Sequence, residues 1–172
     1  MGRAEVVADF DDRFRRLFDA SFESLARYLG RLLGDPDLAA DLAQETFIRL
    51  YRRASIPDDP AAWLFSVANN LLRNEMSKRR RRRRLLGPGR VGALRNPRPR
   101  RPDEELEAEA GRARVRAALD ALPLRERQLL LLSAEGYAYR EIARVLDVAE
   151  GSIGTLLRRA RVKFHAALGD AP

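Results

Sequence analysis

The chain has 172 residues, with 33 lysines and arginines against 25 aspartates and glutamates, and so carries a formal charge of +8. It has no cysteine and one histidine, His165, which excludes disulfides, thiol catalysis, iron–sulfur clusters and cysteine-type zinc sites. The longest uncharged apolar stretch, residues 60–72, is shorter than the roughly 20 residues of a membrane span. Charged residues interrupt the first thirty positions, where a secretory signal needs an apolar run. We therefore expect a cytoplasmic protein without metal, cofactor or membrane insertion.

The positive charge is concentrated in the middle of the chain. Residues 1–77 carry a net charge of −3, residues 78–101 carry +12, and residues 102–172 carry −1. The middle contains the arginine run Arg79–Arg84, followed by several glycines and prolines. This composition predicts a basic flexible linker at 81–102 between a module at 8–80 and a module at 103–172. The linker would attract a polyanion, unless it is only a solvated tether.

The first module has helical periodicity. Its first helix carries an apolar stripe that ends at Gly34; the stripe consists of Phe10, Phe14, Leu17, Phe18, Phe22, Leu25, Leu29 and Leu32. Asp35-Pro36 and Asp59-Pro60 each place a capping carboxylate before a proline, which predicts two further helices from these points. We expect them at 36–53 and from 60 to about residue 80. The module is predicted to be a small helical bundle.

The sequence of the second module also predicts helices. Acidic residues 103–107 favour a first helix to about Leu122, and Pro123 opens a leucine-rich helix that Gly136 ends. Two helices, at 139–146 and from about 150 to 168, flank a tight break at Asp147-Val148 and form a helix-turn-helix. The fold class is therefore all-α: two small helical domains joined by a basic flexible linker.

The last helix has a basic outward side. Ile153, Leu157, Ala160 and Phe164 share one side, which turns a polar set outward: Ser152, Thr155, Arg158, Arg159 and Arg161. Cations concentrated on one helix of a net-negative module suit a phosphate backbone. The alternative is a surface helix whose C-terminal cations only complement the helix dipole.

Two pairs of motifs resemble a known family. Residues 40–51 (ADLAQETFIRLY) and 63–71 (WLFSVANNL) resemble region 2 of the bacterial extracytoplasmic-function sigma factors. Glu141-Ile142-Ala143, Leu146, residues 150–153 (EGSI) and residues 158–161 (RRAR) look like region 4 of that family. The resemblance covers about four fifths of the chain, in the family's order. It implies a sigma factor that gives RNA polymerase its promoter specificity and has no active site of its own.

The resemblance implies a binding site for core RNA polymerase on the helix at 36–53. The matching positions are Asp41, Gln44, Glu45 and Phe47. Carboxylates and an amide would suit an arginine-rich partner helix, with the aromatic ring as a desolvated anchor. Taken without the resemblance, the acidic residues read as ordinary solvated charges and Phe47 as core.

The helix from Pro60 resembles the part that reads the minus-10 element and holds melted promoter DNA. The matching polar side consists of Asn70, Arg73, Asn74, Ser77 and Lys78. The loop at 55–59 matches the segment that receives a flipped base in the family. Trp63 and Phe65 are candidates for stacking on unpaired bases, although a lone tryptophan at helical spacing is more often core.

The helix from Glu150 resembles the one that enters the major groove at the minus-35 element. The residues expected nearest the DNA are Glu150, Ser152, Gly154, Thr155, Arg158, Arg159 and Arg161. The chain departs from the family at Gly154-Thr155-Leu156, where the family commonly carries two cations. Ala138 and Ala149 stand where a capping serine or threonine is usual, which forfeits about 1 kcal/mol each.

The expected partners are core RNA polymerase and promoter DNA, both double-stranded and melted, with no small-molecule substrate. The family often has an inhibitory anti-sigma partner, but no residue here identifies one. The alternative function is an autonomous helix-turn-helix regulator that binds operator DNA as a dimer without polymerase. A third class is an arginine-rich protein that coats DNA. The helices at 36–53 and from Pro60 separate the first function from the second, because a plain regulator does not need them.

Overall fold

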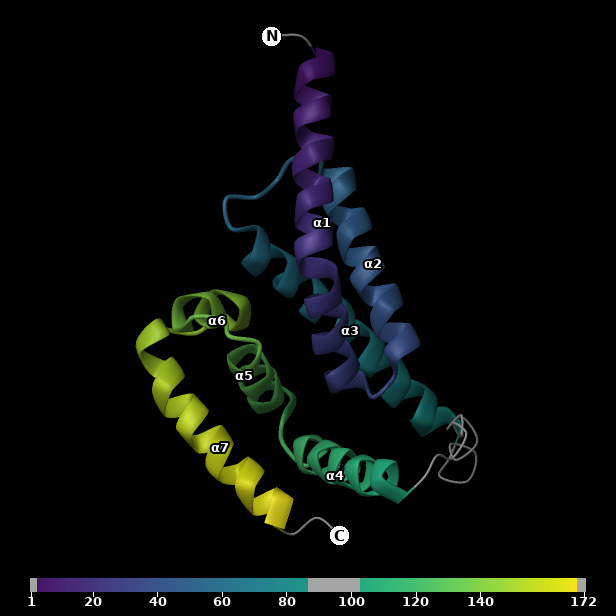
Figure 1. The fold of residues 1–172 in the computed structure, drawn as a ribbon, viewed down its shortest axis with the longest axis vertical. Coiled ribbons are helices and arrows are strands. Elements are labelled where there is room, and N and C mark those ends of the chain that lie inside the picture. The colour runs from purple at the N-terminus through teal and green to yellow at the C-terminus, as the bar shows by residue number, and fades with distance from the viewer. Residues whose placement is uncertain (1–2, 87–102, 170–172) are drawn as a thin grey trace.

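The computed structural model describes residues 3–86 and 103–169, and every element in these two ranges is a helix (Figure 1). The all-α fold class is therefore confirmed for the described chain. The elements are α1 (Arg3–Leu33), α2 (Pro36–Arg53), α3 (Pro60–Leu86), α4 (Asp103–Asp120), α5 (Leu124–Ala134), α6 (Tyr139–Leu146), the short 3₁₀ helix η1 (Glu150–Ser152) and α7 (Ile153–Gly169). None of the described helices is both long and apolar enough to cross a membrane.

Both Asp-Pro pairs start helices, as predicted. Gly34 ends α1 with a positive φ of 67°, and the Asp35 carboxylate accepts a hydrogen bond from the Leu38 N–H at 3.1 Å. The Asp59 carboxylate accepts one from the Ala62 N–H at 3.1 Å at the start of α3. Each carboxylate thereby satisfies an amide that the first helical turn leaves free.

The prediction for the arginine run is wrong, because α3 continues through it to Leu86 instead of ending near residue 80. Arginine is a good helix former, and the Gly87-Pro88 pair that can stop a helix comes only after the run. Arg79 also stabilises this end of α3 through ion pairs with Asp35 at 2.7 Å and Glu75 at 3.7 Å. The rest of the predicted linker, residues 87–102, lies outside the described residues.

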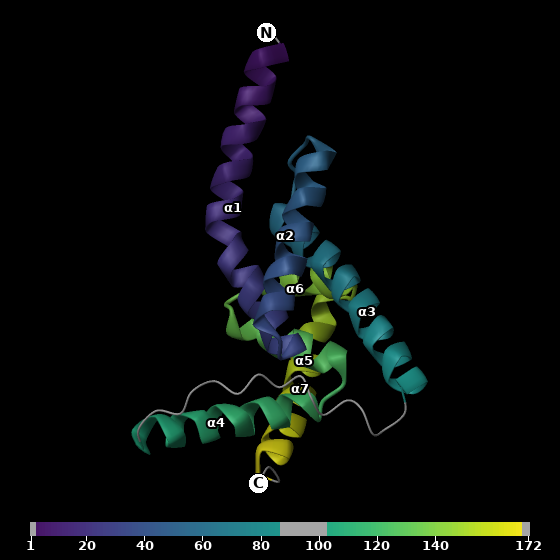
Figure 2. The ribbon, with the colours of Figure 1, turned by 90° about the vertical axis from the view of Figure 1, so that its right-hand side faces the viewer.

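The core of the first module is rich in aromatic rings. Figure 2 shows α1 and α2 side by side with α3 leading away past α2, and Figure 1 shows that α3 crosses behind both helices. Phe47 of α2 is 2% exposed and lies between Phe14, Phe18 and Phe22 of α1, with ring centroids 6.1, 4.9 and 6.1 Å away. Leu25, Leu29, Leu50, Leu64 and Leu72 complete the buried centre. The stripe predicted along the first helix is therefore the side that packs on α2 and α3.

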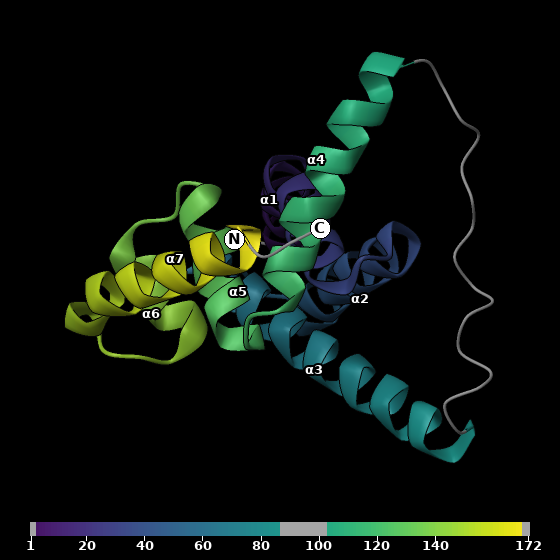
Figure 3. The same ribbon diagram turned by 90° about the horizontal axis from the view of Figure 1, so that it is seen from below.

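The second module packs α5, α6 and α7 around Leu132, Ile142, Ile153 and Leu157, each at most 1% exposed. The chain turns between α6 and η1 at Asp147, which has a positive φ of 52°, and the Val148 N–H donates to the Ala143 carbonyl at 3.0 Å. Helix α4 packs against α7. Figure 3 shows that α3 and α4 extend in different directions from the centre of the molecule.

The two modules are joined by a buried polar contact. The Asn69 side-chain oxygen on α3 accepts hydrogen bonds from the Tyr28 hydroxyl of α1 at 2.9 Å and from the Gln128 amide of α5 at 2.8 Å. Phe65 of α3 meets Tyr137 edge-on beside it, with ring centroids 4.9 Å apart. Because Asn69 Oδ1 accepts two hydrogen bonds, this acceptor can be buried without being left unpaired.

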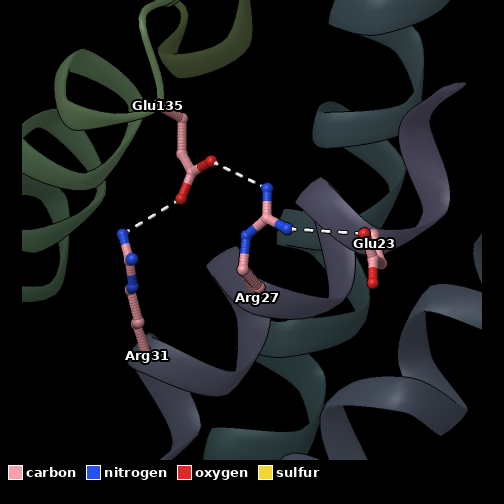
Figure 4. Close-up of polar contacts among 4 residues, drawn as sticks. All are labelled: Glu23, Arg27, Arg31 and Glu135. Atoms are coloured by element: carbon pink, nitrogen blue, oxygen red, sulfur yellow. Dashed lines mark hydrogen bonds and ion pairs between the residues drawn. The ribbon is translucent and has the colours of Figure 1, made fainter.

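Ion pairs at the rim of the junction reinforce it. Arg27 and Arg31 of α1 both reach Glu135 at the end of α5, at 3.4 and 3.0 Å (Figure 4). Arg144 of α6 pairs with Asp59 at the start of α3. Half of each arginine side chain stays exposed, so each pair contributes modestly. Their number and geometry nevertheless fix the orientation of the second module on the first.

Replacing Phe47 with alanine should destabilise the protein by about 3–5 kcal/mol, because the ring fills the space between three other rings and the cavity collapses only in part. Urea denaturation followed by circular dichroism measures the change. Tyr51→Ala is the matched control, since that ring is 53% exposed on the same helix. A loss at Phe47 no larger than the loss at Tyr51 would contradict this packing.

Candidate nucleic-acid interface

The five polar residues predicted to contact minus-10 DNA form one exposed side of α3. This set, called here the α3 stripe, consists of Asn70, Arg73, Asn74, Ser77 and Lys78, and all five are exposed. They recur every three or four residues, so they are neighbours on the helix surface. Leu64, Ala68 and Leu72 occupy the opposite side and are buried. The core thus orients the whole stripe toward solvent.

The N-terminal end of the stripe is organised by its own hydrogen bonds. The Arg73 guanidinium donates to the Asn70 side-chain oxygen at 2.7 Å and to the Asn69 carbonyl at 3.3 Å. This arrangement leaves the Asn70 NH₂ group and further guanidinium N–H groups as donors. Donors of this kind can bind phosphate oxygens or the acceptor edges of bases.

The aromatic residues of α3 face the core. Phe65 is 2% exposed, and its ring meets both Tyr28 and Tyr137 edge-on. This corrects the expectation that Phe65 could stack on an unpaired base, because neither face of the ring is open. Trp63 is half-buried and packs against the hydrophobic core, which agrees with the packing role favoured for it from the sequence.

The loop at 55–59 is held at both ends. Ser55 accepts a hydrogen bond from the Arg53 side chain at 3.1 Å, and Ile56 packs against the core. At the other end Asp59 caps α3 and pairs with Arg144. The Ala62 N–H, and then the Arg144 side chain, hold the pKa of the Asp59 carboxyl below its ordinary value. The carboxylate is therefore a charged contact between the modules.

The residues predicted for polymerase binding do not all share one surface. Asp41 and Gln44 are exposed on α2, and Glu45 is 37% exposed and accepts a hydrogen bond from Arg49 at 2.9 Å. Phe47 is the exception, because it lies in the aromatic core described above. The structure thus corrects its expected role as a surface anchor and leaves an acidic and amide face on α2.

The outward side of η1 and α7 is open as the periodicity predicted. Ile153, Leu157 and Ala160 are buried and Phe164 is half-buried, while the residues expected near minus-35 DNA are exposed. These exposed residues are Glu150, Ser152, Gly154, Thr155, Arg158, Arg159 and Arg161. Figures 1 and 3 place α7 on the side of the second module away from α2. A ligand can therefore approach this surface, called here the α7 face, without displacing the first module.

The helix-turn-helix lacks the usual capping side chains. Ala138 and Ala149 make no side-chain cap, as predicted, although the Glu141 carboxylate accepts a hydrogen bond from the Ala138 N–H at 2.7 Å. The Arg125 guanidinium, from α5, donates to the carbonyls of Leu146 and Asp147 at 3.0 and 3.2 Å. Contacts from neighbouring elements thus replace part of the missing local stabilisation.

The charge of the α7 face comes from three arginines. Lys163 forms an ion pair with Glu126 and is committed to the second module. Among the described residues, no ion pair involves Arg158, Arg159 or Arg161. Three exposed guanidinium groups on one helix are available for phosphate oxygens, which they bind in a fork geometry.

The sequence reasoning missed the polar junction between the modules. Asn69 stands within the apolar stretch at 60–72 and within the motif at 63–71, and Gln128 directly precedes the leucines at 129–132. Polar residues within apolar helices were the available signal, since a buried amide needs a partner. Nothing in the local pattern identified each as a partner of the other, 59 positions apart.

Comparisons with known proteins agree with the motifs. Residues 17–82 match the family model described as "Sigma-70 region 2", and residues 112–164 match "Sigma-70, region 4". The chain is 32% identical over 157 residues to the ECF RNA polymerase sigma factor EcfG of Rhodopseudomonas palustris, covering 87% of this chain and 81% of that protein. It is 32% identical over 151 residues to the ECF RNA polymerase sigma factor SigL of Mycobacterium tuberculosis, covering 85% and 83%.

The fold also has a solved counterpart. The sigma factor RpoE of Bartonella quintana, solved in complex with the anti-sigma factor NepR, superposes with a TM-score of 0.67. The match covers 91% of this chain and 97% of the solved one at 22% identity. The similarity therefore extends over both helical modules.

The ion pair at Asp59 predicts a pH-dependent stability. A carboxyl whose pKa is lowered in the folded state stabilises the fold above its ordinary pKa of 3.8, and this contribution disappears as the pH falls through the folded-state pKa. Asp59→Asn keeps an acceptor for the Ala62 N–H but removes the charge facing Arg144. We expect it to lower the free energy of unfolding by about 0.5–1 kcal/mol at pH 7.

The difference in the free energy of unfolding between the wild type and Asp59→Asn should shrink below pH 3.8, because the wild-type carboxyl is increasingly protonated there. Urea unfolding of both proteins between pH 7 and pH 3 measures it, with Asp58→Asn as the control because Asp58 is exposed in the same loop. A deficit that stays constant over this range would exclude the ion pair as its source.

Proposed function

Because the chain belongs to the extracytoplasmic-function sigma factors of the sigma-70 family, we propose that it carries core RNA polymerase to promoters through three separate surfaces. As a sigma factor it directs transcription initiation. The surfaces are the acidic and amide face of α2, the α3 stripe and the α7 face. The observation that carries the proposal is that all three are exposed at once, although they lie on helices that share one core.

The face of α2 is proposed to bind core polymerase. Asp41 and Gln44 are exposed, and Glu45 is partly exposed one turn after Asp41. A carboxylate pair with an amide beside it can accept hydrogen bonds from the guanidinium groups of an arginine-rich partner helix. The buried ring of Phe47 supports this face from beneath by fixing α2 against α1.

The α3 stripe is proposed to contact the minus-10 element. Its amides and hydroxyl can reach base edges, while Arg73 and Lys78 can neutralise phosphates. The loop at 55–59, which precedes α3, is the proposed place for a base extruded from the melted strand. Its two anchored ends support this role, because a loop that is already held in place adds little ordering cost to the few kcal/mol that unstacking a base costs.

The α7 face is proposed to enter the major groove at the minus-35 element. Glu150, Ser152, Gly154 and Thr155 stand at the N-terminal end of the helix, where base edges are reached first. Arg158, Arg159 and Arg161 follow and suit the flanking phosphates. Gly154 and Thr155 carry no charge. We therefore expect this surface to bind mainly the phosphates of the DNA backbone and to make fewer contacts with base edges.

The chain needs no catalytic group for this role, because the polymerase performs the chemistry. We propose that it works in the cytoplasm, where polymerase and promoter DNA meet. An anti-sigma partner is also proposed, by analogy with the RpoE structure solved with NepR. Such a partner would act by covering one of the three surfaces.

Removing the polar contacts of α2 should weaken binding to core polymerase. The double variant Asp41→Ala, Gln44→Ala is expected to raise the dissociation constant at least tenfold, since a contact in the centre of an interface contributes more than about 1 kcal/mol. Fluorescence anisotropy of the labelled chain, titrated with purified core polymerase, measures it. Asp19→Ala on α1 is the control for an exposed acidic residue. Equal dissociation constants for the two variants would contradict the proposal that α2 binds core polymerase.

A mobility-shift experiment separates the proposed function from an autonomous regulator. We expect a promoter fragment to be shifted specifically by the chain together with core polymerase, but not by either alone. Specific binding by a dimer of the chain without polymerase would indicate an operator-binding regulator instead. Equal binding to every sequence even in the presence of core polymerase would indicate a DNA-coating protein.

A further inference from the structure

The arginine run is part of a helix, so its side chains leave the axis in different directions. Successive residues of an α-helix are rotated by about 100°. Measured around the axis of α3 from the direction of Asn70, Arg81 is therefore rotated by only about 20°. Arg84 is rotated by about 40° in the opposite sense. Both arginines thus lie near the centre line of the α3 stripe, whereas Arg80 lies about 80° away at its edge, Arg82 about 120° away and Arg79 about 180° away.

The contacts of the run agree with this division. Arg79 turns inward and pairs with Asp35, the residue that caps α2, and with Glu75. The Leu38 N–H, and then the Arg79 side chain, hold the pKa of the Asp35 carboxyl below its ordinary value. Arg79 is therefore committed to the fold. It fixes the end of α3 against the start of α2, and with it the direction in which the rest of the run points.

The other described arginines of the run are left without counter-charges. Arg80, Arg81, Arg82 and Arg84 are all exposed. In the described part of the chain, no side-chain hydrogen bond or ion pair involves any of the four. Four uncompensated charges within five positions repel one another, and a polyanion relieves that repulsion.

The position of Arg81 and Arg84 favours DNA as that polyanion. From Asn70 to Arg84 the stripe is about 21 Å long, which corresponds to the rise of about six base pairs. Its first half combines amides with Arg73, while its last turns offer only guanidinium groups, which read phosphate geometry and not sequence. DNA that is bound to the first half of the stripe would therefore continue next to Arg81 and Arg84.

We propose that Arg81 and Arg84 form a sequence-independent phosphate-binding extension of the α3 stripe, which holds the duplex DNA next to the minus-10 element. The inference rests on the proposed function for the location of the duplex. The binding itself follows from the charge and direction of the two side chains. An acidic protein segment is the competing occupant, and the experiment below distinguishes it.

The test compares arginines that differ only in direction. The full-length chain is titrated against a fluorescent 30-base-pair duplex of mixed sequence, and against a single strand of the same length, at several KCl concentrations. The variants are Arg81→Gln with Arg84→Gln on the stripe and Arg80→Gln with Arg82→Gln on its flanks. Both pairs lose two charges from the same segment. Circular dichroism checks that each variant keeps its helices, and the single variants Arg81→Gln and Arg82→Gln repeat the comparison.

Each lost phosphate contact should lower the slope of log K against log salt by about 0.9 on duplex DNA. We expect a decrease of about 1.8 for the stripe pair and less than half of that for the flanking pair. Equal decreases for the two pairs would overturn the inference, because charge alone would then explain them. A change seen only with the single strand would overturn the inference as well. An unchanged slope would also overturn it and would leave an acidic protein segment as the occupant.

Titration with core polymerase keeps this inference apart from the proposed function. If the stripe pair binds core like the wild type and its duplex slope is unchanged, only the phosphate-binding extension fails. If the chain does not bind core at all but the slope decreases as expected, the extension stands and the sigma-factor surfaces on α2 fail. Arg79→Gln serves as the structural comparison and should lower the melting temperature without changing the slope.

Discussion

The side-chain oxygen of Asn69 accepts hydrogen bonds from Tyr28 and Gln128, and this buried contact fixes α3 to both halves of the molecule. Burial raises the pKa of the Tyr28 hydroxyl well above its ordinary value, so the group stays a donor at any ordinary pH. A donor or acceptor left unmet at such a site costs about 1–3 kcal/mol. The three side chains therefore select one docking of α5 on α1 and α3, which the surrounding apolar contacts alone would specify less strictly.

Because α3 is held from within, its two sides have separate roles. The inward side carries the apolar core, Asn69 and the ion pairs of Arg79. The outward side makes only local contacts, the Arg73–Asn70 hydrogen bond and the Lys78–Glu75 ion pair at 3.8 Å, and presents amides, a hydroxyl and cations along its length. The same division recurs in α7, where Ile153, Leu157 and Ala160 are buried beneath exposed arginines. Each proposed nucleic-acid surface thus depends on a helix whose opposite side is packed in the core.

Local signals in the sequence predicted most of the helices. An aspartate before a proline satisfies a free amide and presets the first φ angle, and both such pairs begin helices here. Periodicity likewise predicted the outward side of α7. The arginine run was misjudged because its charge and the nearby glycines suggested a linker, whereas arginine itself favours helix. The burial of Phe47 and Phe65 and the Asn69 junction depend on residues distant in the chain, which local patterns do not reveal.

The central claim is that the chain acts as a sigma factor through the outward side of α3 while the inward side keeps the fold intact. Run-off transcription with purified core polymerase on genomic DNA fragments tests it most directly, with the wild type and with Asn70→Ala, Asn74→Ala. The account predicts transcripts with defined start sites that appear only when the wild-type chain is added, and their loss in the variant although it folds and binds core. Identical transcripts from the variant, or none from the wild type, would contradict it.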